Sequence, residues 1–198
     1  MKRIAIAGGI GAGKTAATDR LQELGFEVID ADEVARRVVD VGAPAWQALR
    51  DAFGDAVLND DRSLDRAFAA DIVFHDPTAL KRLNQITHGH IGNEIVRRLD
   101  ETKGSAVFIA LPLFRPEHRE IFNLDEAWAI QASPEIALRR LLEYRSFSES
   151  DARARLASQM TNEERERIVD HVIWNNGTLE QLDQQLQAQL HRLGIDHG

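Results

Sequence analysis

A glycine-rich loop near the N-terminus constrains the fold more than any other feature of the sequence. Residues 8–15 read GGIGAGKT and match the pattern G-x-x-x-x-G-K-[S/T] without deviation. Glycines let the backbone wrap closely around a phosphate group, and the helix that follows presents its N-terminus to the anion. In such a loop the lysine, here Lys14, reaches the β- and γ-phosphates, and the hydroxyl of Thr15 binds Mg²⁺. The loop therefore predicts a site for ATP and Mg²⁺.

The segments on either side of the loop supply the context that the pattern requires. Residues 2–7 predict a buried strand because 4–7 form a short apolar run, residues 14–24 have helical apolar spacing, and residues 26–29 predict a second strand. This order is typical of a βαβ unit and indicates a parallel sheet. The residues expected to contact the nucleotide are Gly9, Ile10, Gly11, Ala12, Gly13, Lys14, Thr15 and Ala16, with Thr15 also holding the metal ion.

The rest of the chain alternates between short apolar segments and helical patterns, without an internal repeat. Such alternation predicts an α/β fold of the P-loop NTPase class, in which helices flank a parallel sheet. Within 33–100, Gly89 and Gly92 are expected to weaken the middle of a long helix. The expected strands cover 105–111, 127–131 and 171–174, and the expected helices cover most of 33–100, then 134–144, 148–167 and 178–193.

Length, charge and cysteine content narrow the possible functions. A chain of 198 residues is long enough for one compact domain with its own core. The net charge of -8 disfavours non-specific nucleic-acid binding, which depends on cationic neutralisation of phosphates, so no nucleic-acid partner is expected. The absence of cysteine excludes disulfides, and no apolar run reaches the roughly 18 residues that span a membrane. A cytoplasmic location is the default expectation.

Two aspartates follow the second predicted strand. Asp30 and Asp32 lie where a strand of a parallel sheet ends, and ligands bind at this edge in open α/β sheets. A carboxylate there can accept a proton from an attacking hydroxyl group or hold a magnesium-bound water. Asp32 also leads into a helical segment, so a role as helix N-cap is the structural alternative, and both roles can coexist.

A cluster of arginines contains Arg139, Arg140 and Arg145 and precedes a segment rich in both charge signs. Phosphoryl transfer spreads negative charge over the moving group, and an arginine can stabilise that charge strongly. The structural alternative is a solvated helix face held by salt bridges, which is a common environment for such residues. The residues alone leave both interpretations open.

In the order and spacing of several motifs, the chain resembles the dephospho-CoA kinases, the enzymes that complete coenzyme A synthesis. The phosphate loop by itself is shared by many proteins, whereas the ordered set of motifs is much more specific. The resemblance runs over nearly the whole chain. The matching segments are 6–15, 28–32 with Ala35 and Arg36, 86–88, 111–114, 140–142 with Arg145, Gln159, Arg165 and 170–177.

This resemblance implies an activity, roles for particular residues and a division of the chain. The activity is transfer of the γ-phosphoryl group of Mg·ATP to the ribose 3′-hydroxyl of dephospho-CoA. Lys14 would hold the phosphates, Asp32 would be the general base, and Arg140 and Arg145 would be lid arginines. The implied fold is a five-stranded parallel sheet flanked by helices, in a monomer or small homo-oligomer. The implied parts are a core over about 1–31, 101–137 and 169–198, a helical CoA-binding lobe over about 32–100 and a lid over about 138–168.

Four positions depart from the family pattern. Gly89 stands where a proline is expected, Ala110 where some members have an aspartate, and Asn162 where an arginine is frequent. The glutamate that usually follows the P-L-L segment is displaced to Glu117. Two other functions therefore stay open: another small-molecule kinase, such as a nucleoside monophosphate kinase, and a nucleotide-binding regulator that has lost catalysis.

Overall fold

The computed structural model describes residues 1–65, 76–145 and 147–195, and the chain divides into two compact units. The first unit consists of Met1–Asp30 and Glu101–Gly198, and the second consists of Ala31–Asp100. Residues 66–75 of the expected helical stretch lie outside the described residues. The same holds for residue 146 of the expected lid and for 196–198 of the expected core.

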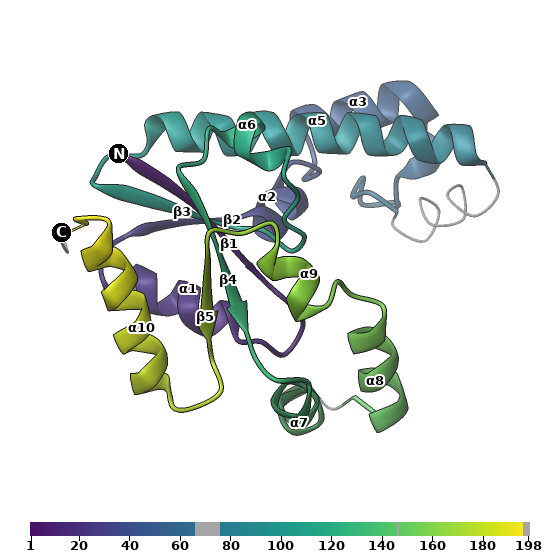
Figure 1. Cartoon of the computed structure of the whole chain (residues 1–198). Coiled ribbons are helices and arrows are strands. Elements are labelled where there is room, and N and C mark those ends of the chain that lie inside the picture. Colours follow the sequence, from purple (N-terminus) through teal and green to yellow (C-terminus); the bar gives the residue numbers. More distant parts are fainter. Residues whose placement is uncertain (66–75, 146, 196–198) are drawn as a thin grey trace. The chain divides into compact units, whose positions relative to one another are not determined.

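A five-stranded parallel sheet forms the centre of the first unit, which confirms the expected fold class (Figure 1). The middle residues of the three central strands are buried, which explains why these strands contain apolar runs, such as 4–7 and 106–110, and not an alternating pattern. The strands are β1 (Lys2–Gly8), β2 (Glu27–Asp30), β3 (Ala106–Ala110), β4 (Glu126–Gln131) and β5 (His171–Trp174), in the spatial order β2-β3-β1-β4-β5.

Helices α1 (Lys14–Glu23) and α10 (Leu179–Arg192) cover one face of this sheet (Figure 1). Alternate side chains of each strand point into this layer because successive residues of a strand face opposite sides. Phe26, Phe108 and Trp128 form an aromatic row within it, with neighbouring ring centroids 5.5 and 5.6 Å apart. The buried core consists of Ile4, Ile6, Ala17, Leu21, Phe26, Ala106, Phe108, Trp128, Ile130, Ile173, Leu182, Leu186, Leu190 and Ile195.

The carboxyl ends of all five strands lie at the same edge of the sheet because the strands are parallel. The register places Gly8 beside Ile130 and Asp30 beside Ala110. The phosphate loop and the segment that leads from β3 to the short helix α6 (His118–Phe122) therefore leave the sheet at this edge. In open parallel sheets this is the edge at which ligands bind.

Three helices of the described chain lie between β4 and β5, namely α7 (Pro134–Arg145), α8 (Glu149–Ala157) and α9 (Asn162–Glu166). The single helix expected over 148–167 is therefore wrong, because the chain leaves the helical conformation between α8 and α9. The cause is a local capping box that starts a new helix. The side chains of Thr161 and Glu164 each accept a hydrogen bond from the other residue's backbone N–H.

The described part of the second unit is mainly helical. Helix α5 continues through Gly89 and Gly92, so the expected weak point does not interrupt it. Nε1 of Trp46 donates a 2.8 Å hydrogen bond to the carbonyl oxygen of Arg62, whose guanidinium group also lies 5.8 Å from the centroid of the Trp46 ring. In the described residues, no helix combines the length and apolar composition needed to cross a membrane. The elements are α2 (Ala31–Arg37), α3 (Pro44–Phe53), the 3-10 turn η1 (Asp55–Val57) and α5 (Pro77–Glu101), which ends one residue beyond the unit.

Candidate active site

The phosphate loop has the backbone shape that its sequence predicts. Gly11 and Gly13 adopt φ angles of 74° and 92°, in the left-handed region that residues with side chains rarely enter. A Cβ atom at Gly11 would lie 2.7 Å from the carbonyl oxygen of Ala137, and one at Gly13 would lie 2.1 Å from Nδ2 of Asn175. Left-handed residues alternating with others give the concave backbone that binds phosphate groups in proteins.

Lys14 and Thr15 begin α1 with side chains that are available to a ligand. The ammonium group of Lys14 and the hydroxyl of Thr15 form no hydrogen bond or ion pair with any residue that the structure describes. The N-cap of α1 is Gly13, which has no side chain to bind the first N–H groups of the helix. Backbone donors, an ammonium group and a hydroxyl suit phosphate oxygens, and the Thr15 oxygen is a ligand of the type that Mg²⁺ prefers.

Two residues from distant segments hold this loop. Nδ2 of the buried Asn175 donates a 2.9 Å hydrogen bond to the carbonyl oxygen of Ala12. Nη1 of Arg140 donates to the carbonyl oxygens of Gly11 and Ala12 at 3.3 and 3.4 Å, and Nη2 donates to Oδ1 of Asn175 at 3.4 Å. The predicted lid arginine Arg140 thus lies against the backbone of the loop, where it supports the shape of the phosphate site.

The linker between α8 and α9 (residues 158–161) contacts the opposite side of the loop. Oε1 of Gln159 accepts a 2.8 Å hydrogen bond from the backbone N–H of Ile10. Arg165, in α9, is only 7% exposed, and its guanidinium group donates to the carbonyl oxygen of Met160 at 2.8 Å and to Oδ1 of Asn162 at 3.1 Å. Burial lowers the pKa of Arg165 because the charged guanidinium loses contact with water.

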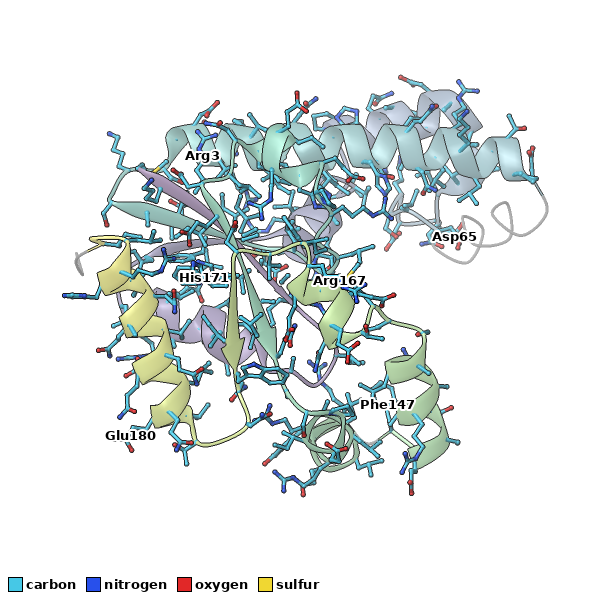
Figure 2. The ribbon with its side chains drawn as sticks, viewed as in Figure 1. Arg3, Asp65, Phe147, Arg167, His171 and Glu180 are labelled. Atoms are coloured by element: carbon cyan, nitrogen blue, oxygen red, sulfur yellow. The ribbon has the colours of Figure 1, made fainter. Side chains whose placement is uncertain are left out.

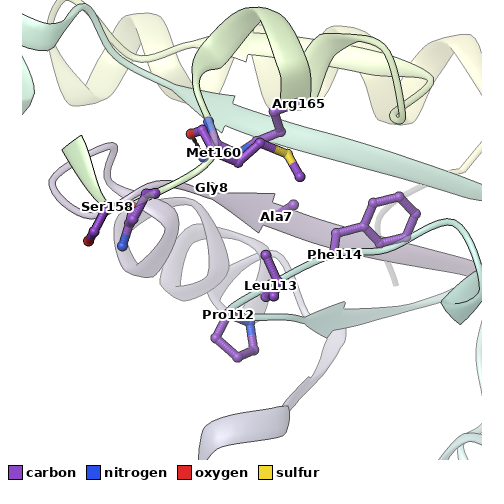
Figure 3. A pocket seen from close by; sticks show the side chains of 9 residues that line it. Ala7, Gly8, Pro112, Leu113, Phe114, Ser158, Met160 and Arg165 are labelled. Atoms are coloured by element: carbon purple, nitrogen blue, oxygen red, sulfur yellow. Dashed lines mark hydrogen bonds between the residues drawn. The ribbon is translucent and has the colours of Figure 1, made fainter. Parts of the chain in front are cut away.

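A pocket of about 280 Å³ opens where β1, the segment after β3 and the α8–α9 linker meet (Figure 3). Figure 3 shows Met160 and Arg165 on one side of this pocket and Pro112 and Leu113 on the other, with Gly8 between them. Arg165 is the charged side chain among otherwise neutral walls. A largely apolar pocket with one cationic group suits an organic ligand that carries an anionic one.

The structure places the other predicted side chains on three different elements. Arg145 is exposed at the C-terminal end of α7. Asp30 is half-buried at the end of β2 in the first unit, and Asp32 is exposed in the first turn of α2 in the second unit. Because α2 begins at Ala31, Asp32 lies inside the first turn and is not the N-cap of the helix.

Sequence reasoning assigned no role to three residues that contact the loop, Gln159, Arg165 and Asn175. Each matches the family pattern in the sequence. Glutamine, arginine and asparagine are common surface residues, so their types give little signal. The available signal was the need for local cationic partners, because a chain with a net charge of -8 must hold an anionic ligand with a few well-placed groups.

Comparison with known proteins agrees with this geometry. The family model described as dephospho-CoA kinase matches residues 2–181. The chain belongs to the dephospho-CoA kinase family. The resemblance that the sequence motifs indicated is therefore confirmed.

Relatives and a solved structure from the same family extend over almost all of the chain. The dephospho-CoA kinase of Corynebacterium jeikeium is 39% identical over 191 residues, which cover 95% of this chain and 97% of that protein. The dephospho-CoA kinase of Carboxydothermus hydrogenoformans is 37% identical over 186 residues, which cover 92% and 90%. The solved structure of the dephospho-CoA kinase from Campylobacter jejuni gives a TM-score of 0.64 at 27% identity, with 97% of both chains covered.

The four departures from the dephospho-CoA kinase pattern lie outside the phosphate loop. Ala110 ends β3 and is 2% exposed, and Gly89 lies within α5. Glu117 is exposed immediately before α6. Asn162 begins α9, and its Oδ1 accepts the hydrogen bond from Arg165. At this position the family's frequent arginine is thus replaced by an acceptor that helps to orient Arg165.

Proposed function

We propose that this chain transfers the γ-phosphoryl group of ATP to the ribose 3′-hydroxyl of dephospho-CoA and so produces coenzyme A and ADP, the last step of coenzyme A synthesis. The observation that carries the proposal is the phosphate loop, whose Lys14 ammonium and Thr15 hydroxyl are unpaired within the described residues and which borders a pocket. Membership of the dephospho-CoA kinase family over residues 2–181 supports the choice of acceptor.

The loop supplies the groups that phosphoryl transfer requires. The backbone N–H groups and Lys14 stabilise the negative charge that spreads over the transferred group. The Thr15 hydroxyl would hold Mg²⁺, which would supply further charge neutralisation when bound. The bond between the γ-phosphorus and the bridging oxygen of ADP breaks as the acceptor oxygen bonds to phosphorus, and the hydroxyl proton passes to a carboxylate.

Asp32 is the proposed general base. It follows the carboxyl end of β2 by two residues and lies in the first turn of α2. A carboxylate within hydrogen-bond reach of the acceptor can take up the hydroxyl proton as its oxygen attacks. Asp30, at the end of β2, is the alternative base.

The proposal extends to the division of the chain. Residues 138–168 form the lid, from which Arg140 and Arg145 act on the ATP phosphates. Residues 32–100 form the CoA-binding lobe, and 1–31, 101–137 and 169–198 form the core. We expect a monomer or small homo-oligomer in the cytoplasm, without a nucleic-acid partner, and the net charge of -8 supports this last expectation.

Acceptor preference tests the proposal. ADP release is measured with Mg·ATP alone, with added dephospho-CoA, and with each nucleoside monophosphate in turn. We expect dephospho-CoA to stimulate ADP release strongly. We expect no stimulation by the nucleoside monophosphates. Stimulation by a monophosphate in its place would support the rival small-molecule kinase. Binding of ATP without stimulation by any acceptor would support the regulator.

A further inference from the structure

Arg165 is a buried cation that forms no ion pair in the described part of the chain. The carboxylate of Glu164 attracts it, but burial of the guanidinium group has the larger effect and lowers the pKa of Arg165. Its guanidinium group donates to a carbonyl oxygen and to an amide oxygen, both of which are neutral. No ion pair joins it to a carboxylate, and its neighbour Glu164 is engaged with Thr161 in the capping box. Proteins rarely bury a charge without a counter-charge because desolvation of the ion is costly. The position therefore favours an anion that is supplied by a ligand.

The guanidinium group of Arg165 lies against the phosphate loop. A Cβ atom at Gly9 would lie 3.3 Å from Nη2 of Arg165 and 3.3 Å from Oε1 of Gln159. The two side chains thus converge on the same point of the loop, at the wall of the pocket shown in Figure 3. Beside Gly9, Arg165 therefore provides a positive charge and Gln159 provides a hydrogen-bond acceptor.

The side-chain oxygen of Gln159 occupies a position beside Arg165 where a hydrogen-bond acceptor of a ligand could bind. Oε1 is 2.8 Å from the backbone nitrogen of Ile10, an N–H group of the phosphate loop. A phosphate oxygen makes the same hydrogen bond with a full or partial negative charge, and such charge-assisted bonds are about twice as strong as neutral ones. Gln159 is exposed, so its side chain can leave this N–H without opening the core.

We propose that Arg165 binds the terminal phosphoryl group of the nucleoside triphosphate, which displaces Gln159 from the N–H of Ile10. This inference rests on the proposed function and deepens it. As the phosphorus leaves the ADP oxygen and bonds to the acceptor oxygen, Arg165 neutralises the charge on the moving group. Arg165 is then a catalytic residue beside Lys14.

The other two candidate arginines are placed differently. Arg140 is hydrogen-bonded to carbonyl oxygens of the loop and to Asn175, and Arg145 is exposed at the end of α7. Of these three arginines, Arg165 is the one that is buried beside the loop without being bonded to its carbonyl groups.

Nucleotide affinities test the assignment with Arg165→Met and the matched control Arg167→Met. Arg167 directly follows α9 and is exposed (Figure 2). Calorimetry measures the Mg²⁺-dependent binding of ADP and of a non-hydrolysable ATP analogue. A hydrogen bond to a charged group contributes about 1.5–3 kcal/mol. Arg165→Met should therefore lower the affinity for the ATP analogue about 10- to 100-fold. ADP affinity should change by less than about threefold, because ADP lacks the terminal phosphoryl group. The control should bind both nucleotides as the wild type does.

A second variant keeps the inference testable if Arg165→Met does not fold. Gln159→Glu places a carboxylate beside Arg165 and the Ile10 N–H, where it competes with the terminal phosphoryl group. Gln159→Glu should lower the affinity for the ATP analogue about tenfold or more and the affinity for ADP much less. Gln159→Ala should not lower the affinity for the analogue. The inference is overturned if the folded Arg165→Met variant loses affinity for ADP and for the ATP analogue equally, or loses affinity for neither. It is likewise overturned if Gln159→Glu binds the analogue as tightly as the wild type.

These binding measurements do not depend on the acceptor. If the wild type distinguishes the two nucleotides through Arg165 but forms no coenzyme A, the proposed function fails and the inference stands. If the wild type forms coenzyme A and the variants leave the affinity for the triphosphate analogue unchanged, the inference fails and the proposed function stands.

Discussion

The side-chain amide of Asn175 donates a 2.9 Å hydrogen bond to the carbonyl oxygen of Ala12, within the phosphate loop. Asn175 is 3% exposed, and its Nδ2 atom fills the space that a Cβ at Gly13 would need. The residue after β5 therefore sets the shape of the loop after β1. The shape of the loop therefore depends on a residue from the C-terminal part of the sheet.

Replacing Asn175 with alanine should weaken nucleotide binding and lower stability. The buried carbonyl oxygen of Ala12 would lose its strongest side-chain donor, at a cost of about 1–3 kcal/mol. We expect a lower free energy of unfolding in urea and an ADP affinity reduced by about tenfold or more. The neighbouring Asn176→Ala, at an exposed position, is the control and should affect ADP affinity much less. Wild-type stability and affinity in Asn175→Ala would contradict this role.

Replacing Gly11 with alanine should abolish tight nucleotide binding. The left-handed backbone costs a residue with a Cβ roughly 1–2 kcal/mol, and the new atom would also lie 2.7 Å from the backbone of Ala137. Gly194→Ala is a matched control because Gly194 has a φ of 64° and no atom within 4 Å of an added Cβ. Both variants should lose stability, but only Gly11→Ala should lose ADP affinity in a fluorescence titration. Equal ADP affinities for the two variants would contradict the prediction.

The sequence predicts the elements whose cause is local. The strand expected over 2–7 and the one expected over 127–131 correspond to β1 and β4 because buried parallel strands are continuous apolar runs. The loop shape follows from glycines that must adopt positive φ. Arg140 could not be placed in this way, since its contact with Gly11 joins residues 129 positions apart. The burial of Arg165 without an ion pair likewise depends on the tertiary fold and cannot be read from the sequence.

The break between α8 and α9 shows where a charge pattern misleads. The mixed charges after Ser148 are compatible with one long helix, and they do form pairs such as Arg153 with Glu149. The capping box of Thr161 and Glu164 nevertheless starts a second helix. Gln159, which accepts the hydrogen bond from the Ile10 N–H, lies in the linker between these two helices.

Asp32→Asn should lower turnover without changing nucleotide affinity. Loss of a general base typically costs about 10²- to 10⁴-fold in rate, whereas the loop proposed to hold the phosphates belongs to the first unit and does not include Asp32. The measurements are kcat for coenzyme A formation and the dissociation constant of ADP, with Asp30→Asn tested in parallel. Wild-type turnover in Asp32→Asn together with a loss in Asp30→Asn would transfer the base to Asp30.

Acidification should destabilise the fold through His118. Its Nδ1 accepts a 3.2 Å hydrogen bond from the backbone N–H of Arg115, and burial lowers its pKa below the ordinary value of 6.5. The unfolded chain therefore takes up this proton at a higher pH than the folded chain does. The resulting stabilisation is present above pH 6.5 and is lost as the pH falls through the lowered pKa.

Urea unfolding at a series of pH values between about 8 and 5 measures this loss for the wild type, His118→Gln and the control His191→Gln. His191 is exposed on α10. His118→Gln should lose less free energy of unfolding on acidification than the wild type, and His191→Gln should follow the wild type. Equal losses in the wild type and His118→Gln would contradict the role of His118.

Product stoichiometry tests the central claim most directly. The purified protein is incubated with Mg·ATP and dephospho-CoA, and ADP and coenzyme A are quantified by chromatography and mass spectrometry, with Lys14→Met as the inactive control. We predict one coenzyme A, phosphorylated at the ribose 3′ position, for each ADP, and no product with the control. ADP formed without coenzyme A, or a phosphate at another position of the acceptor, would contradict the account.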